Sequence, residues 1–280
     1  MKFPPQPTPI PRLSRALSFA VLVASACNAA ERDQPPKHIP ALAPPLTSAP
    51  VVLPAPVPVQ TSKPVPELAP AATPVSPSSA APHHYRIAAI GDSLTDPRSH
   101  GGGYLEYLKT RCPGIEIDNF GKGATMVNQM RRSFEGQVAA SSKHYTHLVV
   151  FGGVNDLYSD LTALRTPAKI EADLGYMYDW AHAHDVKVVA LTVAPWGGFK
   201  RYFNASRAAA TREVNAWIRA QPSQGRVDQV VDAYALLSCG DPDRLCDRFL
   251  TPFKDGIHFG PEGHQILGQA LFQSAFSDCE

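Results

Sequence analysis

A serine, an aspartate and a histidine stand in this chain where their side chains could cooperate in nucleophilic chemistry. Ser93 lies in the segment Gly-Asp-Ser-Leu, directly after a short apolar run, and Asp255 and His258, with two residues between them, lie near the other end. A serine hydroxyl is a weak nucleophile near neutral pH and needs a base, and a carboxylate can orient the histidine that supplies it. We expect Ser93 where a strand turns into a helix, whose amino end would favour a developing oxyanion.

Two further segments contain groups that could stabilise an oxyanion. Asn155 follows the apolar run at residues 146–151, and its neutral side-chain amide is a directional donor. Gly121 and Gly123 follow the run at residues 115–120, and a glycine lets its backbone N–H approach a substrate oxygen closely. Each segment alone also fits an ordinary turn or helix cap. Their occurrence together, in this order, is the stronger indication.

Apolar runs alternate with segments of helical periodicity, which predicts the elements that position these groups. Strands that are apolar along their whole length and alternate with helices indicate a parallel sheet covered on both faces. Ligands of such sheets bind at the carboxyl ends of the strands, where the serine, asparagine and glycines fall. We expect strands at residues 86–90, 115–120, 146–151, 186–193 and 227–234, and helices at 104–111, 127–138, 167–181, 206–220 and 261–276.

The four segments that contain Ser93, the two glycines, Asn155 and His258, here called the first to fourth block in chain order, resemble the SGNH, or GDSL, hydrolase superfamily. This superfamily is named for a Ser, a Gly, an Asn and a His. The resemblance covers residues 86–275 and implies a three-layer α/β/α sandwich with a five-stranded parallel sheet, of the flavodoxin-like type. The matching residues are Ser93 in GDSLTD, Gly123 in NFGKGAT, Asn155 in GGVND, and Asp255 with His258 in DGIHFGPEGH.

The resemblance also implies a mechanism without a cofactor or metal ion. Ser93 attacks an acyl carbonyl, His258 acts as base and then as acid, and Asp255 orients His258. The second block departs from the family pattern, because a lysine stands between its two glycines, so the first glycine stays open as an alternative donor. The implied oxyanion donors are the backbone of Ser93 and Gly123 and the side chain of Asn155.

The expected substrate is a small-molecule or glycan ester, and we favour an acetyl group on a carbohydrate. A lipid acyl hydrolase or an acyltransferase would use the same residues, and a non-catalytic carbohydrate-binding module is the alternative outside enzymes. Trp196, in VAPWGG after the fourth strand, is predicted either to line a substrate groove or to pack within its loop. His182 and His184 are two apart on a predicted helix and face different directions, so no metal site is expected there. We expect a monomer.

The first 82 residues differ from the rest, because they contain 20 of the 28 prolines. Residues 1–30 have the pattern of a secretory signal peptide: early positive charges, a short apolar core and small residues before Cys27. The small residues also resemble a lipobox, so lipidation of Cys27 and simple cleavage near Ala26 or Ala30 both stay open. Residues 31–82, rich in proline and alanine, indicate a disordered linker, and residues 83–280 a single hydrolase domain.

Cysteine usage agrees with an exported protein, either in the periplasm or cell envelope or secreted. The four cysteines of the domain indicate two disulfides, and we favour Cys239–Cys246, which bracket a polar loop, with Cys112–Cys279 as the second. Their spacing does not fit a zinc site. A net charge of +1 argues against a nucleic-acid partner, and the chain has no apolar stretch of 18 residues that would span a membrane.

Overall fold

The structure is a computed structural model, and it describes residues 84–279 of the chain. The predicted signal peptide, the lipidation of Cys27 and the whole N-terminal linker lie outside the described residues and stay predictions. Within the described residues, no helix is long and apolar enough to cross a membrane.

Five parallel strands form one sheet in the order β2-β1-β3-β4-β5, which confirms the predicted sheet. The chain moves outward from β1 in both directions, so the topology switches between β1 and β3. Ligands of open α/β sheets bind at such a switch point, beyond the carboxyl ends of the strands. The strands are β1 (Arg86–Gly91), β2 (Glu116–Asn119), β3 (His147–Phe151), β4 (Lys187–Leu191) and β5 (Gln229–Val231).

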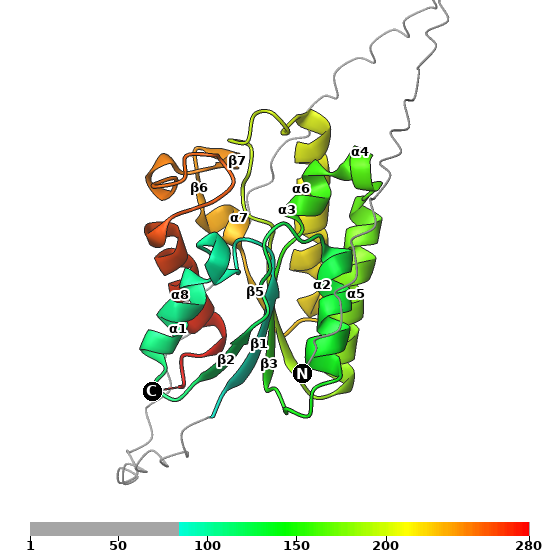
Figure 1. Cartoon of the computed structure of the whole chain (residues 1–280), viewed down its shortest axis with the longest axis vertical. Helices are drawn as coiled ribbons and strands as arrows, with labels where there is room; N and C mark the ends of the chain where they lie inside the picture. The colour runs from blue at the N-terminus through cyan, green and yellow to red at the C-terminus, as the bar shows by residue number, and fades with distance from the viewer. Residues whose placement is uncertain (1–83, 280) are drawn as a thin grey trace, which may run out of the picture. The chain divides into compact units, whose positions relative to one another are not determined.

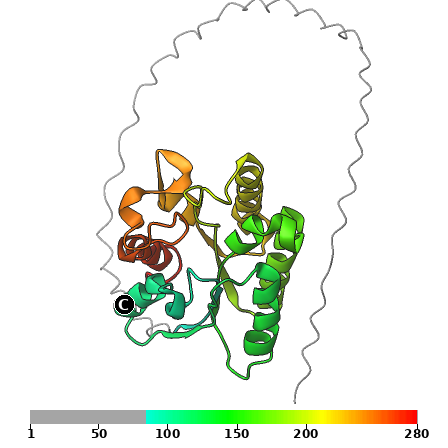
Figure 2. The ribbon, with the colours of Figure 1, turned by 45° about the horizontal axis from the view of Figure 1, so that its top comes forward.

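Helices cover both faces of this sheet, and the predicted three-layer sandwich is therefore confirmed. Figure 1 shows α1 (Gly103–Arg111) and α8 (Pro261–Ala275) against one face. The helices α2 (Val127–Phe134), α5 (Pro167–Ala183) and α6 (Ala205–Ala220) lie against the other face, and the turned view in Figure 2 shows the same separation.

The alternation of side chains along each strand supplies both cores. In β1, Ile87 and Ala89 pack with α1 and α8, whereas Ala88 and Ile90 pack with α2 and α5. Successive strand residues point to opposite faces, so a strand that is covered on both sides must be apolar throughout. This is why the apolar runs of the sequence locate β1 and β3 well.

Shorter elements complete the domain. The helix predicted up to residue 138 ends as α2 at Phe134 and continues as the π-helical segment η2 (Glu135–Ala139). The strand predicted to reach residue 234 is too long, because the side chain of Asp232 accepts the N–H of Ala235 and begins a helix. The remaining elements are η1 (Pro97–Ser99), α3 (Val154–Tyr158), α4 (Asp160–Ala163), η3 (Pro222–Gln224), α7 (Ala233–Leu236), β6 (Ser238–Cys239), β7 (Asp241–Leu245) and η4 (Asp247–Phe249).

Both predicted disulfides are present. Cys112–Cys279 joins the end of α1 to the segment after α8. Cys239–Cys246 closes the small hairpin of β6 and β7. Disulfides persist in oxidising compartments, so this pair favours an extracytoplasmic location for the domain.

Candidate active site

Ser93 lies in a tight turn directly after β1. The N–H groups of Thr95 and Asp96 both donate to the carbonyl of Asp92, at 3.1 and 2.9 Å. The Oδ1 atom of Asp92 accepts the N–H of Leu94 at 2.9 Å. Asp92 is completely buried, so its main chain and side chain fix the turn that presents Ser93.

The prediction that Ser93 stands at the amino end of a helix is wrong. The first helical residues after it belong to η1, a single 3-10 turn that begins at Pro97, and α1 begins only at Gly103. The hydrogen bonds of the turn take the place of helical ones. Donors to an oxyanion must therefore come from individual N–H groups rather than from a helix dipole.

A continuous chain of hydrogen bonds joins Ser93, His258 and Asp255. Ser93 Oγ lies 2.9 Å from His258 Nε2, and His258 Nδ1 lies 2.6 Å from Asp255 Oδ2. A carboxylate only accepts hydrogen bonds, so the Nδ1–H of the ring donates to Asp255 and neutral Nε2 can accept from the serine hydroxyl. Asp255 Oδ1 also accepts the backbone N–H groups of Ile257 and His258, at 3.0 and 2.9 Å.

The electrostatics of Asp255 favour its ionised form. Partial burial would raise its pKa, but the hydrogen bonds from the His258 ring and from two backbone N–H groups outweigh burial and lower the pKa. The loop that carries both residues ends where Pro261 opens α8. This short loop therefore orients the imidazole toward Ser93 across a sequence separation of 165 residues.

Asn155 lies at the start of α3, after a left-handed Gly153 with φ of 122° that turns the chain out of β3. Its side chain is almost fully buried, and its Nδ2 donates to the carbonyl of Thr125 at 3.0 Å. An amide nitrogen has two hydrogens, so the second remains for another acceptor. Asn155 and Ser93 line the same cavity.

The two glycines of the second block both donate to side chains within the protein. The N–H of Gly121 donates to Asn119 Oδ1 at 2.8 Å, and the N–H of Gly123 donates to Asp96 Oδ2 at 2.9 Å. Gly123 and the following Ala124 line the cavity, whereas Gly121 does not. Ala124 has a φ of 60°, and its N–H has no hydrogen-bond partner among the described residues. The structure thus brings the turn of Gly123 and Ala124, rather than Gly121, to the site.

The cavity above Ser93 has a volume of about 730 Å³ and an open, mixed lining. Three aromatic residues, Tyr158, Phe199 and Phe253, form part of its wall, and Arg98 and Lys122 add positive charge. Among the described residues, no cluster of three or more His, Cys, Asp or Glu side chains could hold a metal ion.

Trp196 does not reach this cavity. It is buried in the core, where its Nε1 donates to Thr211 Oγ1 at 2.9 Å and its ring packs edge-on against Phe203. This position does not support the substrate-lining role and agrees with the alternative of a packed loop aromatic. Phe199, three residues later in the same loop, lines the cavity instead.

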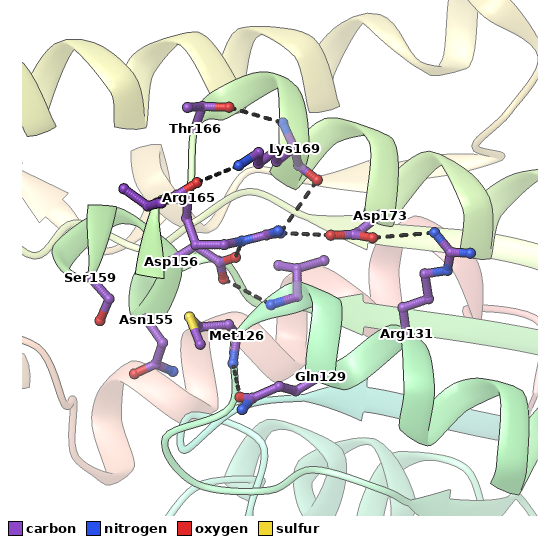
Figure 3. A network of polar contacts seen from close by, with 12 residues as sticks. Met126, Gln129, Arg131, Asn155, Asp156, Ser159, Arg165, Thr166, Lys169 and Asp173 are labelled. Carbon is purple, nitrogen blue, oxygen red and sulfur yellow. Dashed lines mark hydrogen bonds and ion pairs between the residues drawn. The ribbon is translucent and has the colours of Figure 1, made fainter. Parts of the chain in front are cut away.

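A buried ion-pair network holds α3, which carries Asn155, against α2 and α5 (Figure 3). Asp156, which is completely buried, accepts the N–H of Val127 at 2.8 Å and the Nε–H of Arg165 at 2.6 Å. Arg165 also contacts Asp173 at 2.7 Å, and Arg131 lies 3.4 Å from the other oxygen of Asp173. Burial raises the pKa of Asp156, and the Val127 N–H and the Arg165 guanidinium oppose that rise.

Sequence reasoning missed Arg165, although Asp156 directly follows the asparagine of the third block. The signal was the position of an acidic residue beside an apolar strand, since a buried carboxylate needs a cation. No spacing rule identifies which of the arginines supplies that cation.

Similar proteins are found among solved structures and among protein-family models. None of the curated proteins compared with the chain matches it. Among solved structures, it is similar to a GDSL-like lipase from Bacteroides thetaiotaomicron, with 21% identity, a TM-score of 0.57, and 68% of this chain and 87% of the other covered. It is also similar to a lipase/acylhydrolase from Enterococcus faecalis, with 19% identity, a TM-score of 0.54, and coverage of 68% and 94%.

A third similar structure is a catalytic mutant of an acetylxylan esterase from Geobacillus stearothermophilus, with 16% identity, a TM-score of 0.53, and coverage of 68% and 93%. At these identities the likeness establishes the fold. The model of the GDSL-like lipase/acylhydrolase family matches residues 89–266, which is more than half of the chain and includes all four blocks. The chain therefore belongs to the GDSL-like lipase/acylhydrolase family and is a hydrolase of ester bonds.

Proposed function

We propose that the domain is an exported serine esterase in which Ser93 is the nucleophile, His258 the general base and Asp255 the residue that orients His258. The observation that carries this proposal is the hydrogen-bonded chain of these three side chains at the floor of an open cavity. The family supplies the reaction class, and the geometry supports these roles.

The proposed reaction proceeds through an acyl-enzyme. Ser93 Oγ attacks the acyl carbonyl while its proton passes to His258 Nε2, and the resulting imidazolium is stabilised by Asp255. Collapse of the tetrahedral intermediate breaks the ester C–O bond, and the leaving alcohol takes the proton from His258. Water then attacks the acyl-enzyme, again losing its proton to His258, and the carboxylic acid leaves as Ser93 recovers its proton.

The proposed oxyanion hole contains the Ser93 N–H and the free amide hydrogen of Asn155. The Ser93 N–H has no hydrogen-bond partner among the described residues, and the contact with Thr125 fixes the direction of the Asn155 amide. A third donor comes from the turn of Gly123 and Ala124. The Gly123 N–H already donates to Asp96, so it can donate to the oxyanion only as a bifurcated hydrogen bond, whereas the Ala124 N–H, without a partner among the described residues, is free to donate.

An acetyl group on a carbohydrate is the substrate that we favour. The three aromatic rings of the cavity wall are suited to pack against sugar rings, which present apolar faces. The fold is shared with an acetylxylan esterase, and the disulfides fit an enzyme that meets its substrate outside the cytoplasm. The predicted signal peptide at residues 1–30 would direct this export.

Hydrolysis of 4-nitrophenyl acetate by the purified protein tests the catalytic assignment. Ser93→Ala should abolish turnover, and Asn155→Ala should lower kcat about 10²- to 10³-fold because one oxyanion donor is lost. The exposed Ser223→Ala serves as the matched control and should behave as wild type. Full activity of Ser93→Ala would refute the nucleophile, and full activity of Asn155→Ala would refute the oxyanion hole.

Substrate range is a separate test. Rates are compared for 4-nitrophenyl esters of increasing acyl length and for acetylated xylo-oligosaccharides, by release of nitrophenol or acetate. We expect the highest kcat/KM for acetyl esters and release of acetate from the sugar. A clear preference for long acyl chains would favour a lipid acyl hydrolase and overturn the carbohydrate assignment.

A further inference from the structure

A second cavity of about 430 Å³ adjoins the catalytic cavity and shares a wall with it. The shared wall contains Lys122, Gly123 and Ala124, the turn that reaches the proposed oxyanion hole. The far wall consists of α2, including Gln129 and Arg132, and of Gln137 in η2. A group bound in the second cavity would therefore lie beside the reacting ester.

This second cavity carries positive charge that the protein does not neutralise. Lys122 and Arg132 both line it, and no Asp or Glu does. Neither forms an ion pair with any described residue, although neighbouring Arg131 pairs with Glu135 and Asp173. A ligand carboxylate or phosphate would meet two cations and no opposing charge.

The rest of the wall is mixed: Ile90, Phe120 and Met130 are apolar, and the polar Thr125 and Gln129 are held in place by hydrogen bonds. Thr125 Oγ1 donates to the carbonyl of Lys122 at 2.6 Å, which fixes the turn that carries this lysine. Gln129 Oε1 accepts the N–H of Met126 at 2.9 Å, which leaves its side-chain NH2 group as a further donor. On the catalytic side, Asp96 is already paired with Arg98. The second cavity is thus the more electropositive of the two.

We infer that the second cavity is a subsite for a negatively charged group of the ester substrate, with Lys122 and Arg132 as its anion-binding residues. The substrate class is an acylated sugar that also carries a carboxylate or a phosphate near the ester. This inference rests on the proposed esterase function and adds to it the charge of the substrate.

Three matched compounds test the subsite: an acetylated methyl glucoside, the corresponding acetylated methyl glycoside of glucuronic acid with a free carboxylate at the sixth carbon, and the corresponding acetylated methyl glucoside 6-phosphate. They carry the same acetyl ester on the same ring and differ at the sixth carbon. Acetate release gives kcat/KM for each. We expect one or both anionic compounds to exceed the neutral one at least tenfold, and the difference between carboxylate and phosphate identifies the preferred anion.

The variants address the two cations directly. Lys122→Ala combined with Arg132→Ala should lower the anionic-to-neutral ratio of kcat/KM about tenfold, as loss of two solvent-accessible ionic contacts implies. Arg132→Glu should lower the ratio more than Arg132→Ala does, because it places a negative charge in the subsite instead of only removing the positive one. Lys187→Ala, an exposed lysine at the opposite end of the sheet, is the control and should keep the wild-type ratio.

The anionic-to-neutral ratio of kcat/KM should also depend on ionic strength. Raising the ionic strength from 0.05 to 0.5 M should reduce the ratio for wild type but not for the double variant, because salt screens accessible charges. A wild-type ratio near one would overturn the subsite, as would a ratio that the double variant leaves unchanged. Lack of activity on all three compounds and on 4-nitrophenyl acetate would instead refute the proposed esterase itself.

Discussion

Replacement of Arg165 by methionine perturbs the network that holds α3, which carries Asn155. Methionine keeps much of the length and apolar volume of the side chain but removes its charge. Arg165 is nearly buried, and its partner Asp156 is completely buried, so water cannot replace the lost guanidinium. The variant thus leaves a buried carboxylate without its cation.

The expected loss of folding stability follows from the contacts that Arg165 makes. Two short charge-assisted hydrogen bonds are lost, at 2.6 Å to Asp156 and 2.7 Å to Asp173. Val127 still donates to Asp156, and Arg131 still contacts Asp173, so part of each carboxylate remains satisfied. Loss of one partner of a buried pair costs about 3–5 kcal/mol, and we expect a destabilisation of about 3–4 kcal/mol.

The loss should depend on pH, with a sign that follows from Asp156. Burial already raises the pKa of this carboxyl, and removal of the guanidinium raises it further. A carboxyl whose pKa is higher in the folded than in the unfolded protein loses stability as the pH rises through the folded value. Arg165→Met should therefore be more destabilising at pH 8 than at pH 5.

Urea unfolding of wild type and variant at both pH values measures this effect. The control is Arg226→Met, which removes an accessible pair with Asp179 and should cost no more than about 1 kcal/mol. A loss of under 1 kcal/mol for Arg165→Met, or an equal loss at pH 5 and pH 8, would refute the reasoning. A fall in kcat with little change in KM would show in addition that Arg165 positions the oxyanion donor Asn155.

Two other predictions concern stability. Burial raises the pKa of Asp92 to about 7 from an ordinary value of 3.8, so the contribution of Asp92 to folding stability is fully present below pH 3.8 and is lost as the pH rises through 7. In thermal unfolding, Asp92→Asn should therefore be more stable than wild type at pH 8 but differ little from it at pH 5. An equal effect at both pH values would contradict this. In the chain-entropy description, loss of the Cys112–Cys279 disulfide, which spans 167 residues, should cost about 5 kcal/mol of stability, and loss of Cys239–Cys246, which spans 7, about 2 kcal/mol. Urea unfolding of the two paired Cys→Ser variants measures both losses, and the reverse order would contradict this description.

The central strands β1, β3 and β4 could be predicted from the sequence because they are buried on both faces, whereas the edge strands β2 and β5 are partly exposed. The runs at residues 86–90 and 146–151 correspond closely to β1 and β3, since all positions after the first residue of each strand are buried and apolar or glycine. The end of β5 was not readable, because the apolar pattern continues through Tyr234 while the side chain of Asp232 starts a helix. Apolar content alone does not distinguish a strand that continues from a strand that ends where a helix begins.

The order of the site along the chain was readable, but its finer contacts were not. Residue type and placement after strands brought Ser93, Asn155 and His258 into consideration, and the sheet collects them at one cavity. Whether Trp196 or Phe199 faces that cavity depends on the path of a single loop. The same holds for the Gly123 N–H, whose bond to Asp96 joins two loops that are remote in sequence.

The identity of the nucleophile is tested most directly by covalent labelling. The protein is treated with a fluorophosphonate, its intact mass is measured, and the modified peptide is identified after digestion, with His258→Ala as the variant that lacks the base. We expect one adduct, located on Ser93, that forms in wild type and forms at least 10²-fold more slowly in His258→Ala. No adduct in wild type, or an adduct on another serine, would contradict this expectation.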